Sequence, residues 1–204
     1  MSADPKFWDR IAKKYAARPV DDPESYELKL AKTREYLTPD SEVLEFACGT
    51  GTTAIKHAPL VKHIHATDIS AEMLDIAKGK AEGIPNISFA QSSIEDLPDD
   101  NQYDIILGMS ILHLVEDVPA VLAKVNRLLK PGGYFISSTT CMNDAAPWLK
   151  YLTPILQPFG KVPHLSWFRR NELEDMMAQA GFTLDYILQP TPKKAVFIVA
   201  GKRG

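Results

Sequence analysis

Short apolar runs alternate with amphipathic stretches along the middle of the chain. Runs this short are typical of buried strands. Between them, apolar residues return every three or four positions over residues 70–83 and 117–129, which indicates two helices. Strands that alternate with helices predict an α/β fold with a largely parallel sheet. The first four apolar runs begin at Val43, Lys62, Ile87 and Tyr103.

Two further regions frame this core. Apolar residues at helical spacing, among them Trp8 and Tyr15, predict a first helix, and Asp22 is a candidate N-cap for a second that ends near residue 38. We therefore expect residues 1–38 to form a helical cap on a single domain that covers residues 1–204. Residues 141–168 hold four prolines yet keep some helical spacing, which predicts a lid-like insertion.

The residues Gly49-Thr50-Gly51 end the first apolar run, and helix-compatible residues follow them. Glycine permits a tight turn and leaves no Cβ above the backbone, so a ligand can lie directly on the chain. The free N–H groups of the following helix would point at that ligand. Asp68 comes 17 residues after Gly51, at the end of the next strand, where an acidic residue reaches ribose hydroxyls in a βαβ unit.

Two families share a loop of this kind. Residues 49–54 fit the G-x-G-x-x-G/A fingerprint of dinucleotide enzymes. The longer pattern Glu45-x-x-Cys48-Gly49-x-Gly51 resembles motif I of class I S-adenosylmethionine (SAM) methyltransferases. A carboxylate is unfavourable beside a pyrophosphate but acceptable near the ammonium group of a methionine, which favours the second family. The segment LLKPGGYFIS at residues 128–137 also resembles the way that this family enters its fifth strand.

This resemblance implies the complete fold. We expect an α/β, Rossmann-like, doubly wound seven-stranded sheet, mostly parallel with an antiparallel last strand. N-terminal helices and a lid insertion after strand five would complete it. Residues 183–188 and 195–200 read as two last strands joined through Pro190-Thr191-Pro192, and so short a link suits a hairpin. Dinucleotide enzymes commonly have six parallel strands, so the C-terminal region favours the methyltransferase family.

The resemblance also implies SAM as the cofactor and suggests its contacts. Asp68 would hold the ribose, Ile69 and Met73 would flank the adenine, and Tyr15 would touch the cofactor carboxylate. Where the family commonly has an acid that accepts from the adenine amino group, this chain has the neutral Ser93. The expected cofactor contacts are Tyr15, Glu45, Ala47, Cys48, Gly49, Gly51, Asp68, Ile69, Met73, Ser93, Ile94, Gly108 and Met109.

The acceptor side is less defined. The segment after the fourth strand lacks the Asn/Asp-Pro-Pro-aromatic motif with which related enzymes methylate exocyclic amines of nucleobases or glutamine amides. His113 is the candidate general base, because the ordinary pKa of histidine is near 6.5; packing against a neighbouring helix is the alternative. Core packing is likewise the alternative for Trp8 and Tyr15. The expected acceptor contacts are Trp8, Ser110, Trp148 and Leu152.

Composition limits the partners. A net charge of −3 argues against a generic nucleic-acid binder. The two cysteines, Cys48 and Cys141, are not spaced as a metal site, and a reducing cytoplasm is their simplest location. The N-terminal residues do not resemble a signal peptide, and no apolar run approaches the roughly 20 residues that span a bilayer. We therefore expect a cytoplasmic enzyme without a metal ion; its oligomeric state stays open.

Three functions are compatible with these patterns. The leading hypothesis is a SAM-dependent methyltransferase that transfers a methyl group to a small-molecule acceptor. An NAD(P)-dependent oxidoreductase is the second, because the same loop reads as G-x-G-x-x-A. A SAM-binding protein without catalysis is the third, because Ser93 replaces an expected acid and the sequence offers no secure base.

Overall fold

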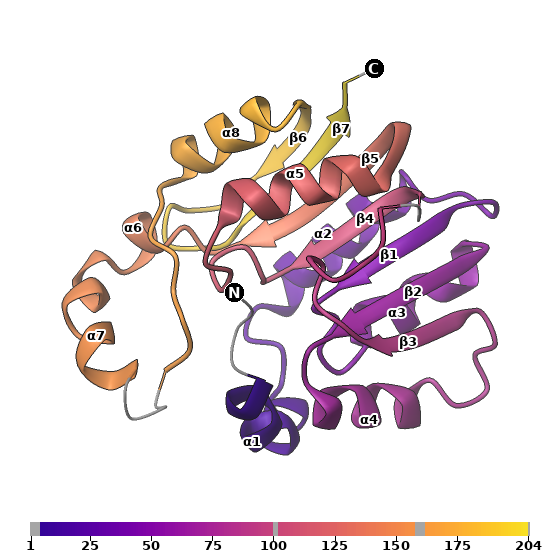
Figure 1. Cartoon of the computed structure of the whole chain (residues 1–204), viewed down its shortest axis with the longest axis horizontal. Helices are drawn as coiled ribbons and strands as arrows, with labels where there is room; N and C mark the ends of the chain where they lie inside the picture. Colours follow the sequence, from indigo (N-terminus) through magenta and orange to yellow (C-terminus); the bar gives the residue numbers. More distant parts are fainter. Residues whose placement is uncertain (1–4, 100–101, 158–161, 204) are drawn as a thin grey trace.

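A seven-stranded sheet with helices on both faces forms the centre of the molecule (Figure 1). The computed structural model describes residues 5–99, 102–157 and 162–203. The strand order is β3-β2-β1-β4-β5-β7-β6. The strands are β1 Glu42–Phe46, β2 His63–Asp68, β3 Ile87–Gln91, β4 Tyr103–Met109, β5 Leu129–Thr139, β6 Phe182–Leu188 and β7 Val196–Lys202.

Strand direction follows the prediction. Strand β1 pairs in parallel with β2 and β4, and β7 runs antiparallel to both β5 and β6. Val43, Leu44 and Phe46 of β1 are almost fully buried, because the central strand of such a sheet is covered on both faces. The expected α/β, Rossmann-like sheet with an antiparallel last strand is therefore confirmed.

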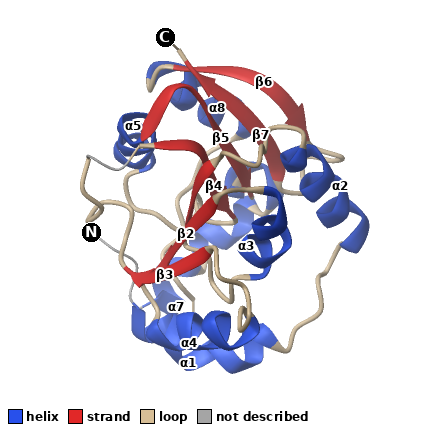
Figure 2. Ribbon diagram, turned by 90° about the vertical axis from the view of Figure 1, so that its right-hand side faces the viewer, coloured by secondary structure: helices blue, strands red, loops and turns tan. Residues whose placement is uncertain are grey.

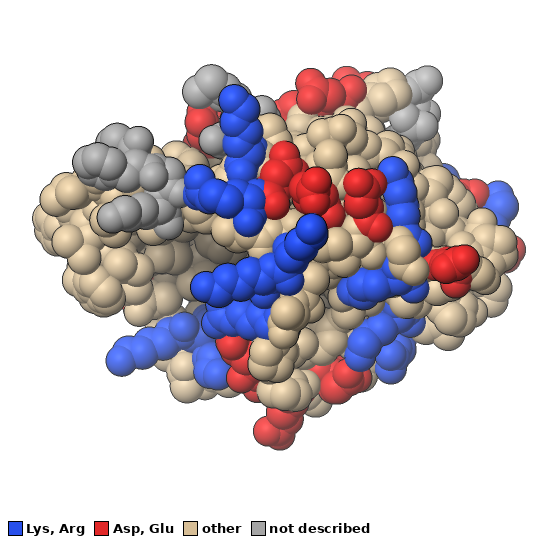
Figure 3. Space-filling model, turned by 90° about the horizontal axis from the view of Figure 1, so that it is seen from below, with Lys and Arg blue, Asp and Glu red and all other residues tan. Residues whose placement is uncertain are grey.

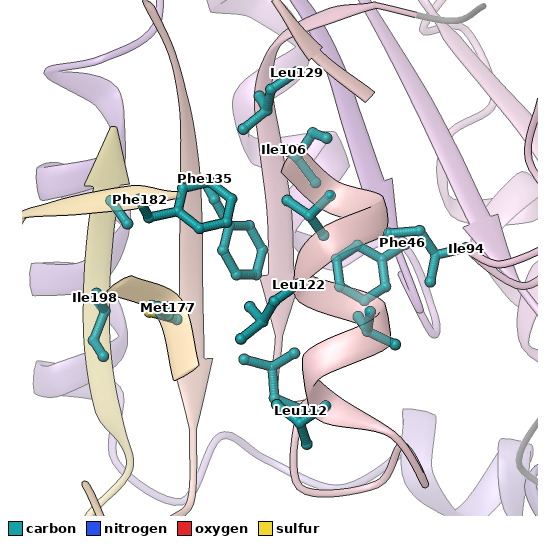
Figure 4. Close-up of a cluster of buried hydrophobic side chains, with 14 of the residues drawn as sticks. Phe46, Ile94, Ile106, Leu112, Leu122, Leu129, Phe135, Met177, Phe182 and Ile198 are labelled. Carbon is teal, nitrogen blue, oxygen red and sulfur yellow. The ribbon is translucent and has the colours of Figure 1, made fainter. Parts of the chain in front are cut away.

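Helices cover the two faces in separate layers, as Figures 1 and 2 show. Helices α5 and α8 cover one face, where Phe46, Leu122 and Phe182 belong to one buried cluster (Figure 4). Ala54 and Leu74, from α3 and α4, belong to the cluster on the opposite face. The longer helices are α1 Pro5–Ala16, α2 Pro23–Arg34, α3 Thr52–His57, α4 Ala71–Lys80, α5 Val118–Leu128 and α8 Arg170–Gln179, and the 3₁₀ turn η1 spans Ala58–Leu60.

Three helix ends differ from the predicted ones. Helix α2 ends at Arg34 and not near residue 38, because Thr38 and Ser41 form a turn in which the Thr38 N–H donates to Ser41 Oγ at 3.0 Å. Helix α4 ends three residues before Gly83, which lies in the left-handed region at φ 83°. Helix α5 ends at Leu128, one residue before the predicted end, because Leu129 already belongs to β5.

The segment predicted as an insertion follows β5 directly and is partly helical. It contains α6 Met142–Ala145, the 3₁₀ turn η2 Pro147–Tyr151 and α7 Thr153–Leu156. Residues 158–161 of the segment lie outside the described residues. Its last part is tied to the loop after β4, since the Ser166 N–H donates to the His113 carbonyl at 2.9 Å and Ser166 Oγ donates to the Val115 carbonyl.

Candidate functional site

A cavity opens at the C-terminal ends of β1, β2, β3 and β4, where parallel α/β sheets usually bind ligands. About 850 Å³ of space free of protein atoms lies within it, part of this being open solvent. The turn after each of these strands contributes to its wall, and α1 adds two aromatic side chains. The lining residues are Trp8, Tyr15, Phe46, Ala47, Gly49, Asp68, Ile69, Met73, Ser92, Ser93, Ile94, Glu95, Met109, Ser110, Ile111, Leu114 and Val115.

The turn after β1 exposes backbone to the cavity. Ala47, Gly49 and Gly51 all have positive φ, at 52°, 54° and 70°. A Cβ added at Gly49 would meet no atom within 4 Å, so this glycine leaves open space above the chain. A Cβ at Gly51 would lie 2.9 Å from the Cβ of Ala77, so this glycine permits close packing of α4. The two glycines therefore have different roles, and only Gly49 lines the cavity.

Asp68 ends β2 and faces the cavity, although only 7% of its surface is exposed. Its Oδ2 accepts from the Gly49 N–H at 2.8 Å and its Oδ1 from the Ser70 N–H at 2.9 Å. Burial raises the pKa of this carboxyl, while the hydrogen bonds from Ser70 and Gly49 oppose the rise. A carboxylate has about four lone-pair sites, so Asp68 can still accept from a ligand hydroxyl.

Helix α1 packs beside α4 and closes one side of the cavity (Figure 1). Ser70 Oγ donates to Asp9 Oδ1 at 2.6 Å, and the Glu72 N–H donates to the same oxygen at 3.3 Å. Asp9 thus accepts from the first turn of α4, where a helix has free N–H groups. Trp8, beside Asp9 in the chain, lines the cavity together with Tyr15. The alternative that both aromatics lie in the core is wrong, since Tyr15 is 48% exposed and Trp8 borders the cavity.

The side of the cavity predicted to hold the adenine is formed by the loop after β2 with the first turn of α4, and by the loop after β3. Ile69 and Met73 line it, with Ser93 and Ile94 from the loop after β3. Ser93 Oγ donates to Asp96 Oδ2 at 2.7 Å and accepts from the Asp96 N–H at 3.3 Å. A hydroxyl has one proton and two lone pairs, so one lone pair of Ser93 stays available.

Glu45 and Cys48 lie behind the turn rather than on the cavity wall. Glu45 is 2% exposed, and its Oε2 has no hydrogen-bond partner in the described part of the chain. Burial raises the pKa of Glu45 to about 8. Burial likewise raises the pKa of the Cys48 thiol far above its ordinary range. The structure therefore does not place these two side chains in direct contact with a ligand in the cavity.

The segment after β4 divides into residues that line the cavity and residues that support it. Met109 and Ser110 line it, and Ser110 has a positive φ of 60°. Gly108 does not line the cavity. A Cβ there would lie 2.8 Å from the Phe46 ring, so this glycine lets that ring pack. His113 is also absent from the lining, and burial lowers its pKa to about 4. Its Nδ1 is buried without a partner among the described residues.

Trp148 and Leu152 do not reach the cavity wall. They lie in η2 and just after it, and they are 61% and 42% exposed. Helical spacing in this segment predicted an inward apolar side, but the short helices α6, η2 and α7 turn much of it toward solvent. None of the described residues of the insertion lines the cavity, so its role as a lid stays a prediction.

Several lining residues were not predicted: Phe46, Ser92, Glu95, Ile111, Leu114 and Val115. Phe46 was expected to lie in the core because it belongs to an apolar run. Ser92 and Glu95 directly adjoin residues that were predicted to line the site. Ile111, Leu114 and Val115 surround His113 in the sequence. Their signal was available, because the loop after a strand at this sheet edge is expected to border the ligand.

Comparisons with known proteins agree with this geometry. Residues 18–187 match the family described as a methyltransferase domain. A demethylmenaquinone methyltransferase of Staphylococcus saprophyticus is 28% identical over 171 residues, which is 70% of each chain. The uncharacterized protein YafE of Escherichia coli is 43% identical over 131 residues, or 63% of each chain. Among solved structures, the complex of DhpI with S-adenosylhomocysteine (SAH) superimposes with a TM-score of 0.76 at 20% identity. The match covers 98% of this chain and 95% of that one.

The chain belongs to the class I SAM-dependent methyltransferases. It is an enzyme of that class, and its cofactor is SAM, which carries a methyl group on a positively charged sulfur. This excludes the oxidoreductase hypothesis and the hypothesis of a binding protein without catalysis. The residues present fit a nucleoside of this kind, since Asp68 can still accept from a ligand hydroxyl and Gly49 leaves the backbone uncovered.

Proposed function

We propose that this enzyme methylates an uncharged, largely apolar small molecule. One observation carries the proposal: none of the described residues that line the cavity is Lys, Arg or His. A carboxylate or phosphate acceptor would lose its hydration without gaining a cationic partner, which is strongly unfavourable. Much of the remaining lining is instead apolar, with Trp8, Ile111, Leu114 and Val115 among it.

The cofactor half of the cavity is assigned by chemistry. In our proposal Asp68 accepts from the ribose hydroxyls and Gly49 lies under the ligand. Ile69, Met73 and Ile94 form an apolar slot for the adenine. The adenine amino group donates a hydrogen bond to the remaining lone pair of the Ser93 hydroxyl. Tyr15 lies at the opposite end as a donor, and its pKa is raised by burial and by the charge of Asp68, so its hydroxyl keeps its proton.

The acceptor is placed by packing more than by charge. The acceptor enters between α1 and the loop of residues 110–115, where Met109 and Ser110 border the position of the methyl group. The protein then contributes alignment and exclusion of water, which are the main requirements when the methyl group is already activated. The name of the Staphylococcus saprophyticus relative denotes a quinone-type ring as its acceptor. A ring of that kind suits the apolar wall described above.

We propose that His113 supports the loop and is not the general base. Its ring lies outside the cavity lining, and a pKa of about 4 makes it a weak base at neutral pH. Its carbonyl, which accepts from the Ser166 N–H, connects the loop to the insertion. An acceptor whose proton is acidic enough to leave to water needs no stronger base.

Matched pairs of acceptors test the proposal. Formation of S-adenosylhomocysteine is followed with neutral phenols or hydroquinones and with analogues that differ by one carboxylate. We expect turnover of neutral compounds and at least about a tenfold lower kcat/KM for the charged analogues, equivalent to about 1.4 kcal/mol. Ile111→Ala should raise KM for the acceptor without changing SAH affinity, whereas Ile187→Ala, outside the cavity, should change neither. Preference for the charged analogues would disprove the assignment.

A further inference from the structure

The three most exposed large apolar side chains and a fourth exposed one lie in one short segment. Trp148, Tyr151, Leu152 and Ile155 are 61%, 80%, 42% and 62% exposed. They are four of the eight exposed large hydrophobic residues in the described part of the chain, and they fall within residues 147–156. Monomeric soluble proteins rarely expose apolar side chains so close together without a partner. We call these four residues the apolar patch.

The segment that carries the apolar patch is positively charged, although the whole chain carries −3. Residues 147–156 contain one charged residue, the exposed Lys150. Helix α1 contributes four exposed cationic side chains, which we call the basic face: Lys6, Arg10, Lys13 and Lys14.

Lys13 and Lys14 are not neutralised by an acid of their own helix. The one acid of α1, Asp9, accepts from Ser70 and from the Glu72 backbone and is thus directed at α4. Lys13 and Lys14 make no ion pair with another described residue. Seen from below, Lys and Arg side chains gather where Figure 1 places α1, with some Asp and Glu side chains among them, beside a lobe at the left with little charge, where α6 and α7 lie (Figure 3).

The patch and the basic face flank the cavity. Figures 1 and 2 both place α1 and α7 at the same lower end of the molecule. Helix α1 lines the cavity through Trp8 and Tyr15. The segment that carries the apolar patch is bonded through Ser166 to the loop that supplies Leu114 and Val115. A surface that covered both features would therefore face the cavity.

We propose that the apolar patch and the basic face dock this protein on the surface of a bilayer containing anionic phospholipid. The apolar side chains would enter the boundary between headgroups and acyl chains, and the cations of α1 would lie among the phosphates. No helix in the described residues has the length and apolar character needed to cross a membrane, so the contact is peripheral. The proposal concerns the outer surface and holds whichever acceptor the cavity takes.

Charge favours a bilayer over a second copy of the chain. A two-fold dimer would bring the same surface of each copy together, so Lys13 and Lys14 would face a surface that also carries their own equivalents. Like charges in that position are unfavourable. An anionic bilayer instead complements the cations and accepts the apolar side chains at once.

Vesicle flotation of the full-length protein tests the proposal. Vesicles of phosphatidylcholine alone are compared with vesicles that also contain phosphatidylglycerol. We expect at least about tenfold stronger binding to the anionic vesicles at low salt, and a loss of that difference at high salt. Lys13→Glu with Lys14→Glu should weaken binding at least about tenfold, and Tyr151→Ser with Ile155→Ser should weaken binding to a similar degree.

Matched controls lie elsewhere on the surface. Lys193→Glu changes an exposed cation, and Leu28→Ser removes a side chain that is 52% exposed on α2. Both should bind vesicles like the unaltered protein, and all variants should keep its melting temperature and SAH affinity. Absence of vesicle binding, or equal binding by patch variants and unaltered protein, overturns the proposal. So does light scattering that shows a dimer which Tyr151→Ser with Ile155→Ser converts to a monomer.

Discussion

The two glycines after β1 lead to a prediction that separates packing from binding. Both have positive φ, where alanine costs about 1–2 kcal/mol more than glycine. Gly49→Ala meets no other atom within 4 Å, so this conformational cost is its whole effect on folding. Gly51→Ala would bring two Cβ atoms to 2.9 Å, and forced overpacking of this kind adds about 1–3 kcal/mol.

These free energies translate into melting temperatures. For a domain of this size, 1 kcal/mol corresponds to about 2–4 °C. Gly49→Ala should therefore lower the melting temperature by about 2–8 °C, and Gly51→Ala should lower it by a further 2–12 °C or so. Binding should show the opposite order, because the methyl group at Gly49 projects into open space at the cavity wall. We expect SAH affinity to fall at least about tenfold for Gly49→Ala, which equals about 1.4 kcal/mol.

Differential scanning calorimetry and isothermal titration with SAH measure both quantities on the same samples. SAH affinity of Gly51→Ala is measured well below its melting temperature, where the folded fraction is close to one. Two results would refute the reasoning. One is an equal loss of melting temperature in the two variants, and the other is unchanged SAH affinity in Gly49→Ala.

Four further predictions follow from single contacts. Asp68→Asn should weaken SAH binding about 5- to 150-fold by calorimetry, because an amide NH₂ would face a backbone N–H; an unchanged Kd would exclude Asp68 from the site. Asp9→Ala should weaken SAH binding several-fold and expose α1 amides to hydrogen exchange, whereas Asp21→Ala, on the exposed loop after α1, should do neither. Glu45→Gln should remove a fall in melting temperature as pH rises from about 5 through 8. The buried carboxyl binds its proton more tightly when folded, so its stabilising contribution is complete below the ordinary pKa of 4.5 and is lost through about 8; parallel curves for both proteins would contradict this. His113→Gln should leave the shape of the kcat/KM profile unchanged between about pH 6 and 8, because a pKa of about 4 keeps the ring neutral there; loss of a limb near pH 6.5 would restore His113 as the base.

The fold was predictable because local pattern and chain topology agree. Apolar runs, glycine turns and caps such as Ser70 and Asp117 all point to the same alternation of strands and helices. The boundaries were less predictable. Leu129 continues the apolar helix pattern in sequence, but its pairing with Tyr103 in the sheet decides that the strand begins there.

The site was predictable where backbone determines it and less so where side chains compete for space. Gly49 and Asp68 line the cavity because a strand end and its turn can face only one way in a parallel sheet. Gly51 and Gly108 were also expected to contact the cofactor but serve packing, a distinction that depends on Ala77 and Phe46 from other elements. The spacing of apolar residues along the sequence does not reveal such contacts.

The predictions for the insertion and for the base needed information that the sequence does not carry. Helical spacing among Trp148, Leu152 and Ile155 indicates one apolar side but not whether that side faces protein. The ordinary pKa of His113 likewise depends on water around the ring, and the fold removes that water.

The contacts of Ser70 affect how the cofactor enters and leaves the cavity. Its backbone N–H holds Asp68, and its hydroxyl holds Asp9, so one residue fastens both the sugar-binding strand end and the helix over the cavity. Movement of helix α1 away from α4 would break the hydrogen bonds that Asp9 accepts from Ser70 and Glu72. Release of the spent cofactor would then require these hydrogen bonds to break first, and in many enzymes such an opening step sets the turnover rate.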